Sequence, residues 1–373
     1  MGKYYLNTAS QTPVKTEVLE VIIDTLKNHW YNPSDKFEKG IESKKILNNA
    51  KEIIAKNINA EPDQIVICAS GSMANNLAIK GYCGKQSSMV ITTNIEHSSI
   101  RDMKYTYYDR LPVGKNGIID PRVLEEYLNQ KRLNRFIVSM QYANNELGTL
   151  QPIKELIEIT HKHGGFFHCD ATQYYPYYKI DVKELDVDML TVSGHKLGAP
   201  AGIAFLYVKD RSILEPMVYG EQDSLVAGTE NLAYINGLAK AIELIDYGNT
   251  RKIENLRNYF EESVLKNIND TYINGSIQNR VYHISNICFK GCDAETLQDL
   301  LDMSGIMCST GSACNSYSKE PSFVLTAIGL EEPDSLSCLR FSFDESLSYK
   351  DIDEIVDKLK YRVEFLRNMN FDF

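Results

Sequence analysis

The chain has 373 residues, of which 43% are hydrophobic and 24% charged, and its formal net charge at pH 7 is −10. This length allows a large core and two domains, and the composition is that of an ordinary globular protein. The negative charge argues against direct binding of nucleic acid, and no apolar stretch approaches the roughly 20 residues that span a bilayer.

The N-terminus and the cysteines predict a cytoplasmic protein. Residues 1–7 lack the apolar run of a secretion signal. The eight cysteines are scattered, without CxxC pairs or Cys/His groups at zinc spacing. Cys288 and Cys292 lie four residues apart with no second pair nearby, so we predict no metal site. Free thiols without a secretion signal are typical of a reducing compartment.

The first 60 residues predict an irregular arm followed by two helices. Residues 1 to about 15 form the arm, in which Pro13 prevents regular structure. Apolar residues at helical spacing then predict amphipathic helices near 18–26 and over 41–58.

From residue 62 onward, short runs of β-forming residues alternate with helical patterns. This alternation predicts a mostly parallel sheet. The expected strands cover 64–68, 89–93, 136–140, 166–170, 187–192 and 203–208. Helices are expected between them, including 73–82 and one that begins near 96–99.

After about residue 250 the alternation weakens, which predicts a second, smaller α+β domain. A helix over 250–265 leads into it, and a final amphipathic helix covers 352–366, with Ser348 as its N-cap. We therefore predict a large domain over 16–250 and a small domain built from 1–15 plus 251–373.

Polar or small residues follow the ends of several expected strands. In open sheets of this kind, ligands bind beyond the carboxyl ends of the strands. The sequence therefore predicts a site at this edge, formed by Gly71, His97, Asn145, Asp170, Gln173 and Lys196.

Lys196 ends the segment Ser193-Gly194-His195-Lys196, which follows a buried strand. A lysine in this place is costly unless it is neutral, paired or covalently linked. A covalent bond to a carbonyl cofactor would remove that cost and use the amine for chemistry. From the tetrapeptide alone, a surface lysine on a turn remains an alternative.

Three segments together resemble a known family. They are Asp-Ala-Thr-Gln at 170–173, Ser-Gly-His-Lys at 193–196 and Ser-Thr-Gly-Ser-Ala-Cys-Asn-Ser at 309–316. In this order and spacing they resemble cysteine desulfurases of the NifS/IscS type, which are class V aminotransferases that use pyridoxal phosphate (PLP). The resemblance covers nearly the whole chain. It implies the α/β fold of fold type I, aspartate aminotransferase-like PLP enzymes, and conversion of L-cysteine to L-alanine with transfer of the sulfur.

The resemblance implies roles for residues around the cofactor ring. Lys196 binds the cofactor and moves the substrate Cα proton, while Asp170 pairs with the pyridinium nitrogen. Gln173 bonds the phenolic oxygen, and His97 stacks on the ring and assists proton transfer. Judged singly, Asp170 could instead be a helix N-cap, Gln173 an exposed side chain and His97 a structural histidine.

The resemblance also implies how phosphate and substrate are held. Thr229 reaches the phosphate of the other subunit in this family, which implies a homodimer with shared sites. Asn145 and Arg340 bind the substrate, Arg340 by a bidentate fork to its carboxylate. A surface arginine on a strand is the alternative for Arg340. Within one subunit, the expected phosphate-binding residues are Gly71, Ser72, Met73, Ser193 and His195.

Cys314 distinguishes this family from other PLP enzymes. It lies among Gly and Ser residues, which predicts a mobile loop. A thiolate there would take the substrate sulfur as a persulfide and carry it to an acceptor protein. That acceptor would be an iron–sulfur scaffold or a tRNA-thiolation enzyme.

The chain departs from the family pattern in several places, two of which lie near the expected phosphate site. The first phosphate loop lacks the usual threonine, and we expect Ser72 to replace it as a donor. Asp223 and Val226 stand where the family commonly has arginines, which lowers the positive charge near the phosphate. Two alternatives therefore stay open: a related selenocysteine lyase or aminotransferase, and a binding partner that kept the fold without catalysis.

Overall fold

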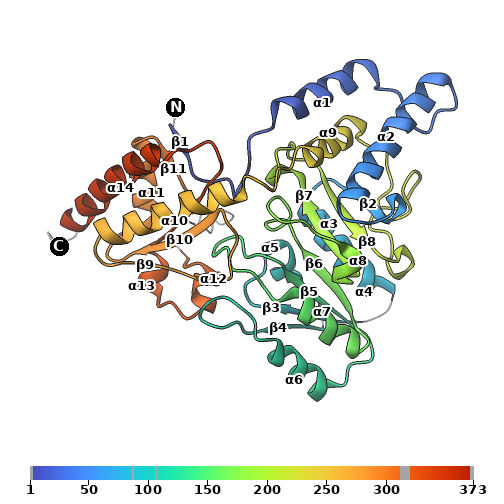
Figure 1. The fold of residues 1–373 in the computed structure, drawn as a ribbon. Helices are drawn as coiled ribbons and strands as arrows, with labels where there is room; N and C mark the ends of the chain where they lie inside the picture. Colours follow the sequence, from blue (N-terminus) through green and yellow to red (C-terminus); the bar gives the residue numbers. More distant parts are fainter. Residues whose placement is uncertain (1–2, 86–87, 106, 311–319, 370–373) are drawn as a thin grey trace.

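A computed structural model describes residues 3–85, 88–105, 107–310 and 320–369 (Figure 1). A seven-stranded sheet forms the centre of the larger body, in the order β2-β8-β7-β6-β5-β3-β4. β8 is antiparallel to β2 and β7, and the other neighbouring pairs are parallel. The strands are β2 (Ile65–Cys68), β3 (Met89–Thr93), β4 (Tyr108–Leu111), β5 (Phe136–Gln141), β6 (Phe166–Asp170), β7 (Met189–Ser193) and β8 (Ala204–Val208).

Every strand of this sheet except β8 therefore ends at the same edge, and the prediction of a mostly parallel sheet is confirmed. The edge strand β4 was not predicted. Its sequence, Tyr-Asp-Arg-Leu, has one buried residue, Leu111, and its pairing with β3 places it in the sheet.

Helices cover both faces of the sheet because both faces are apolar. Phe205 and Tyr207 of β8 point to one face, and Leu206 and Val208 point to the other. The first face is covered by α1 (Thr16–Asn28), α2 (Glu38–Asn57), α6 (Pro121–Lys131), α7 (Ile153–Lys162), α8 (Val182–Leu185) and α9 (Leu232–Glu243). The second face is covered by α3 (Gly71–Asn76), a π-helical turn (Leu77–Gly81), α4 (Tyr82–Lys85) and α5 (Ser98–Arg101).

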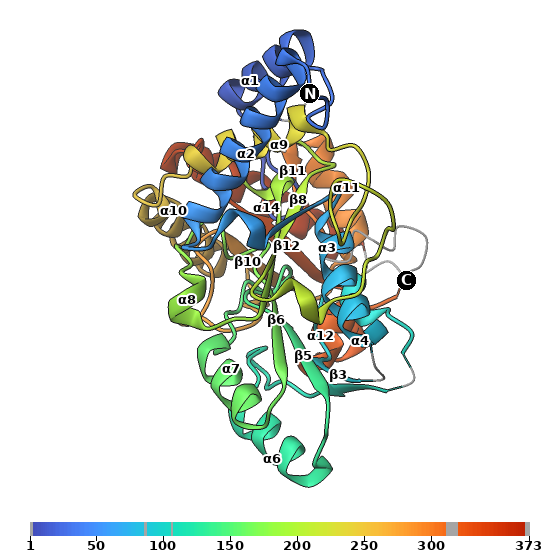
Figure 2. The same cartoon turned by 90° about the vertical axis from the view of Figure 1, so that its right-hand side faces the viewer.

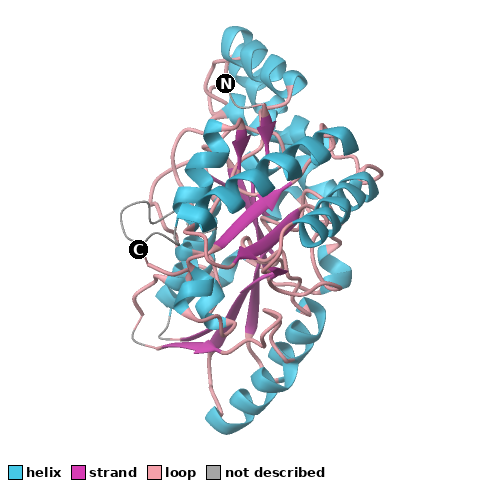
Figure 3. Cartoon of the chain, turned by 90° about the vertical axis from the view of Figure 1, so that its left-hand side faces the viewer, coloured by secondary structure: helices cyan, strands magenta, loops and turns pink. Residues whose placement is uncertain are grey.

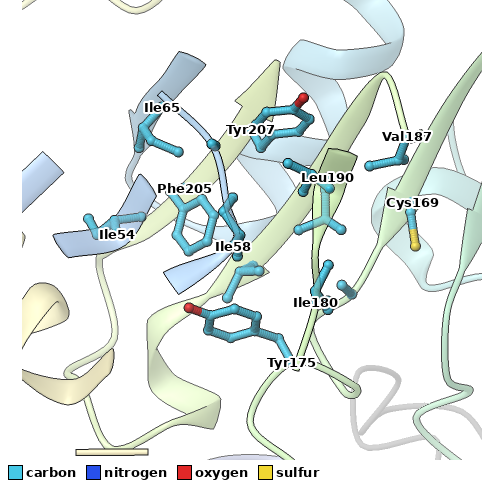
Figure 4. Packing of buried hydrophobic residues seen from close by; sticks show 14 of the residues in the cluster. Ile54, Ile58, Ile65, Cys169, Tyr175, Ile180, Val187, Leu190, Phe205 and Tyr207 are labelled. Atoms are coloured by element: carbon cyan, nitrogen blue, oxygen red, sulfur yellow. The ribbon is translucent and has the colours of Figure 1, made fainter. Parts of the chain in front are cut away.

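The figures show this layering. In Figure 2, α7 and α8 lie on one side of β6, and α3 and α4 lie on the other. Figure 4 shows the packing on the first face, where Phe205 lies near Ile58 and Tyr175. The Phe205 and Tyr175 rings meet edge to face, with centroids 5.9 Å apart.

The smaller body is built on an antiparallel sheet, in the order β12-β10-β9. Helices pack on it, as the colouring by secondary structure in Figure 3 shows. Ser348 and Asp351 exchange hydrogen bonds at the start of the last helix, so the predicted N-cap is confirmed. The elements of the smaller body are α10 (Thr250–Asn267), β9 (Thr271–Ile273), β10 (Ile284–Phe289), α11 (Ala294–Met303), β11 (Ile306–Met307), α12 (Phe323–Ala327), α13 (Glu332–Ser335), β12 (Cys338–Ser342) and α14 (Tyr349–Met369).

The N-terminal arm joins the smaller body. It contains a short strand, β1 (Tyr4–Tyr5), which pairs in parallel with β11. Tyr4 and Leu6 are buried in the apolar cluster of the smaller body. On these contacts we propose that residues 1–15 form one domain with 251–373. Within the described ranges, no helix is both long and apolar enough to cross a membrane.

The core packing generates a stability prediction. Phe205 is fully buried, so Phe205→Ala should lower the free energy of unfolding by about 3–5 kcal/mol. Tyr361 on α14 is 61% exposed, and Tyr361→Ala should change it by less than about 1 kcal/mol. Urea unfolding followed by circular dichroism measures both, and equal losses in the two variants would contradict the packing described.

Candidate active site

A pocket of about 190 Å³ lies at the carboxyl edge of the large sheet. The N-terminal arm and β12 of the smaller body complete its wall. Most of the residues predicted for the site line this one pocket, although they are far apart in the sequence. The predicted residues in its lining are Gly71, Ser72, His97, Asn145, Asp170, Gln173, Ser193, His195, Lys196 and Arg340.

Lys196 reaches the pocket from a tight turn after β7. The turn, Gly194–Lys196, requires glycine at its start, because a Cβ on Gly194 would lie 2.9 Å from the backbone oxygen of Ile203. Lys196 Nζ donates to the carbonyl oxygen of Ala9 at 2.6 Å and also to that of Ser10. The amine is therefore inside the pocket and faces the N-terminal arm.

Asp170 is the last residue of β6 and is 7% exposed. Its Oδ1 accepts a hydrogen bond from the Thr172 backbone N–H at 3.0 Å, and its Oδ2 accepts one from Asn75 Nδ2 at 2.7 Å. These donors stabilise the carboxylate where it is buried. Gln173 Nε2 donates to the Ala9 oxygen that also accepts from Lys196, so the arm closes one side of the pocket.

Two histidines of the pocket are held in the neutral form. His195 Nδ1 lies 2.9 Å from Ser193 Oγ. Burial, together with the positive charge of Lys196, lowers the pKa of His195 to about 4. Burial also lowers the pKa of His97, although the nearby Asp170 carboxylate raises it. At neutral pH both rings therefore act as hydrogen-bonding groups without charge.

Arg340 reaches the pocket from the smaller body and is 3% exposed. Its Nη1 donates to the backbone oxygen of Asn145 at 2.8 Å, and its Nη2 donates to Asn7 Oδ1 at 2.8 Å. β12, the N-terminal arm and the loop after β5 thus fix the guanidinium together. A group held in this way can offer a planar pair of donors to a carboxylate.

Three predicted residues are not brought to the pocket by the described structure. Met73 packs in the apolar cluster on the second face of the sheet, and its N–H donates to Ser70 Oγ at 3.1 Å. Thr229 is exposed and does not line the pocket. Cys314 lies outside the described residues.

Sequence reasoning missed part of the lining. Thr172 lies in the Asp-Ala-Thr-Gln motif, and Asn75 stands in an Asn-Asn pair on the helix that follows β2, so both carried a local signal. Ala9 and Ser10 carried none, because their arm has no periodic pattern. Among the described residues, no three His, Cys, Asp or Glu side chains group together in a way that could hold a metal ion.

The chain is similar to known proteins over almost its whole length. The family model "Aminotransferase class-V" matches residues 4–355. Cysteine desulfurase IscS of Dictyoglomus turgidum is 36% identical, with 98% of this chain and 96% of the relative aligned. Cysteine desulfurase IscS of Methanosarcina thermophila is also 36% identical, over 98% and 93%.

Solved structures share the fold. A NifS-like protein superposes with a TM-score of 0.89 at 25% identity, over 98% of this chain and 100% of that one. A structure described as SspA in complex with cysteine gives a TM-score of 0.81 at 31% identity, over 91% and 99%. The agreement covers both bodies of the molecule.

A buried histidine on β6, two residues before Asp170, generates a pH prediction. His168 is fully buried between Ser139 Oγ and Thr191 Oγ1, at 2.8 and 2.9 Å, and burial lowers its pKa to about 4. Between about pH 6.5 and pH 4, His168 binds a proton in the unfolded chain but not in the folded one. The stabilising contribution is therefore complete above pH 6.5 and is lost as the pH falls toward 4.

We expect the free energy of unfolding of the wild type to fall by about 2 kcal/mol relative to His168→Gln between pH 7.5 and pH 5. Urea titrations of both proteins at these two pH values measure the difference. A constant difference would show that His168 is not buried in neutral form.

Proposed function

The chain belongs to the class V aminotransferase family and is a cysteine desulfurase of the NifS/IscS type, and we propose that Lys196, Asp170 and Cys314 carry its reaction with PLP as cofactor. The single observation that supports these assignments best is the pocket itself. It unites an amine, a buried carboxylate and a fixed guanidinium at the edge where sheets of this kind bind ligands.

The pocket residues fit PLP in their donor chemistry and in the space that Gly71 leaves open. A Cβ on Gly71 would lie 3.2 Å from the Cβ of Ser193 and 3.7 Å from Thr172 Oγ1, so glycine keeps open a space bordered by hydroxyl donors. We propose that the phosphate occupies this space, with Ser72 and His195 as further donors. The buried Oδ1 of Asn145 has no hydrogen-bond partner among the described residues, which leaves it available to a bound molecule.

When bound, PLP withdraws electrons from the Cα of an amino acid. Lys196 would hold the cofactor and then accept and return the substrate Cα proton. Asp170, fixed by Thr172 and Asn75, would keep the ring nitrogen protonated, and Gln173 would bond the phenolic oxygen. Arg340 would bind the substrate carboxylate and Asn145 would contact the substrate.

Cys314 would complete the reaction. Its thiolate attacks the sulfur of the substrate, so the Cβ–S bond breaks and a persulfide forms on Cys314. The carbon product takes up a proton and leaves as alanine. Ser309 supports this role: its N–H donates to the Arg340 backbone oxygen at 3.1 Å. Cys314 is five residues further on, within about 17 Å of extended chain from that point.

Ser322, eight residues after Cys314 in the sequence, is also attached near the pocket. Ser322 Oγ donates to Glu146 Oε2 at 2.6 Å, and Glu146 follows Asn145 in the chain.

Asp223 stands where the family commonly has an arginine, and its negative charge is compensated within this chain. It pairs with Arg211 at 2.6 Å and accepts hydrogen bonds from the N–H groups of Leu225 and Val226.

We further propose that the enzyme is a homodimer. One side of α1 packs in the core through Val18 and Ile22, while Leu19, Ile23 and Leu26 on the other side are 41–57% exposed. A helix with a second apolar side needs a partner to cover it. A second copy would cover this side, and we propose that its exposed Thr229 reaches the phosphate in the neighbouring pocket.

The persulfide would pass to an acceptor protein, either an iron–sulfur scaffold or a tRNA-thiolation enzyme, without direct contact between this chain and nucleic acid. The net charge of −10 supports transfer through a protein. We also propose a cytoplasmic location, since the seven described cysteines are free thiols.

Substitution of Cys314 tests the reaction. Cys314→Ser should retain bound PLP and its spectral response to cysteine, but lose alanine and sulfide formation by at least about 10³-fold, because the acceptor of sulfur is gone. Lys196→Ala should lose the spectrum of the covalently held cofactor. Cys83→Ser on α4 is the matched control and should keep full activity.

The assays are amino-acid analysis for alanine, a sulfide assay with added thiol, and absorption spectra of the purified proteins. Unchanged desulfuration by Cys314→Ser would exclude Cys314 as the acceptor. Cleavage of selenocysteine alone would favour the related lyase.

Disruption of the exposed side of α1 tests the dimer. Leu26→Asp should shift the protein from dimer to monomer at micromolar concentration, since a buried charge without a partner weakens an interface strongly. Leu265→Asp on α10, where the leucine is 45% exposed, is the control and should leave the dimer intact. Sedimentation equilibrium measures the mass, and a wild type that sediments as a monomer would refute the dimer.

A further inference from the structure

Asn75 joins two parts of the active site that the sequence did not connect. It lies on α3, is 1% exposed and lines the pocket. Its Nδ2 donates one hydrogen bond to Asp170 Oδ2 at 2.7 Å and another to Ser99 Oγ at 2.9 Å. If the amide were turned over, its oxygen would face the carboxylate of Asp170 and repel it. The negative charge of Asp170 therefore sets the orientation of the Asn75 amide.

The direction of the next hydrogen bond follows from this orientation. Ser99 Oγ accepts from Asn75, so its own proton is available for His97 Nδ1, 2.8 Å away. The Ser99 backbone N–H also donates to Nδ1, at 3.2 Å. With two donors at Nδ1, the neutral ring must carry its proton on Nε2, the nitrogen on the opposite side of the ring.

We propose that Asn75 and Ser99 are positioning residues that hold neutral His97 with its proton on Nε2 and couple this state to the carboxylate of Asp170. The inference rests on the proposed function of Asp170 and His97 at the cofactor. A His97 ring in this state offers a donor at Nε2. It can give a proton to the substrate or cofactor, and it cannot take one from the substrate thiol at that nitrogen.

This row of hydrogen bonds does not let a proton pass between Asp170 and His97. Asn75 donates in both directions, and an amide N–H does not pass a proton on as a hydroxyl does. The two groups therefore influence one another through charge and orientation without exchanging a proton. Each can keep its own protonation state while it contacts a different part of a bound cofactor.

The charges around His97 determine how its pKa responds to a substitution. Lys196 and Arg101 lower it, Asp170 and Asp102 raise it, and His195 is also nearby. The two donors at Nδ1 favour the neutral ring. Removing one of them should raise the pKa of His97, because the neutral form loses a bond that the protonated form could not make.

Nuclear magnetic resonance of the full-length protein with ¹⁵N-labelled histidine tests the proposal, both as the holoenzyme and after removal of PLP. The variants are Asn75→Leu, which has a similar shape without donors, Ser99→Ala, and Ser99→Thr, which restores the hydroxyl. Ser98→Ala changes the neighbouring serine of the same helical turn and is the control. The signal of His97 is identified by its loss in His97→Gln.

In the wild type, Ser98→Ala and Ser99→Thr, we expect the proton of neutral His97 on Nε2 and the same pKa. In Ser99→Ala, the pKa should rise by about one unit, the value of one hydrogen bond. In Asn75→Leu, it should also rise, because the Ser99 hydroxyl is then free to turn and accept a hydrogen bond from a protonated Nδ1. The double variant should shift it no further than the larger single shift, because both residues act through one chain.

A proton on Nδ1 in the wild type would overturn the proposal. So would a pKa that does not change in Asn75→Leu and Ser99→Ala, or two shifts that add. The ring signal is measured whether or not PLP binds. A protein that does not bind PLP would therefore refute the proposed function and still decide the role of Asn75 and Ser99.

Discussion

The buried carboxylate of Asp170 is the constraint on which the active site depends. A charge at the end of a buried strand is stable only with hydrogen-bond donors around it. Thr172 supplies one from the turn after β6, and Asn75 supplies the other from α3. The hydrogen bond from Asn75 joins α3, on the second face of the sheet, to the end of β6. The site is therefore organised before any cofactor or substrate is bound.

The histidines show how burial controls charge in the same pocket. His195 and His97 lie among Lys196, Arg101 and the interior of the protein, and a protonated ring would be unstable there. We assign the covalent bond to the cofactor to Lys196 and recognition of the substrate carboxylate to Arg340, and neither role to the neutral histidines. The separation of roles follows from desolvation, which penalises the charged form of a group that has a neutral form near pH 7.

The smaller body and the N-terminal arm complete a site that lies mostly on the large sheet. Arg340 crosses from β12 to the backbone of Asn145 and to Asn7 of the arm. Ala9 and Ser10 of the arm in turn accept hydrogen bonds from Lys196, and Ala9 also accepts one from Gln173. The proposed substrate site therefore exists only where both bodies and the arm meet. Movement of one body against the other would change the position of Arg340 relative to Lys196.

The sequence alone determined the parts of this protein that depend on local pattern. Alternating strands and helices predicted the sheet, and the residues that follow the strand ends, among them Asp170 and Lys196, predicted the groups at its edge. This worked because strand periodicity and strand-end residues are properties of short segments. The resemblance added the roles of these groups, including that of Cys314, which lies outside the described residues.

Only the tertiary structure decided which groups touch. The contact of Asn75 with Asp170 joins residues 95 positions apart, and that of Asn7 with Arg340 joins residues 333 apart. The sequence around Asn75 does not specify Asp170 as its partner, and the sequence around Asn7 does not specify Arg340. Met73 was expected at the phosphate, yet Ser70 uses its N–H in the helix cap. Such contacts depend on strand order, register and domain packing, which are set by the summed burial of the whole core.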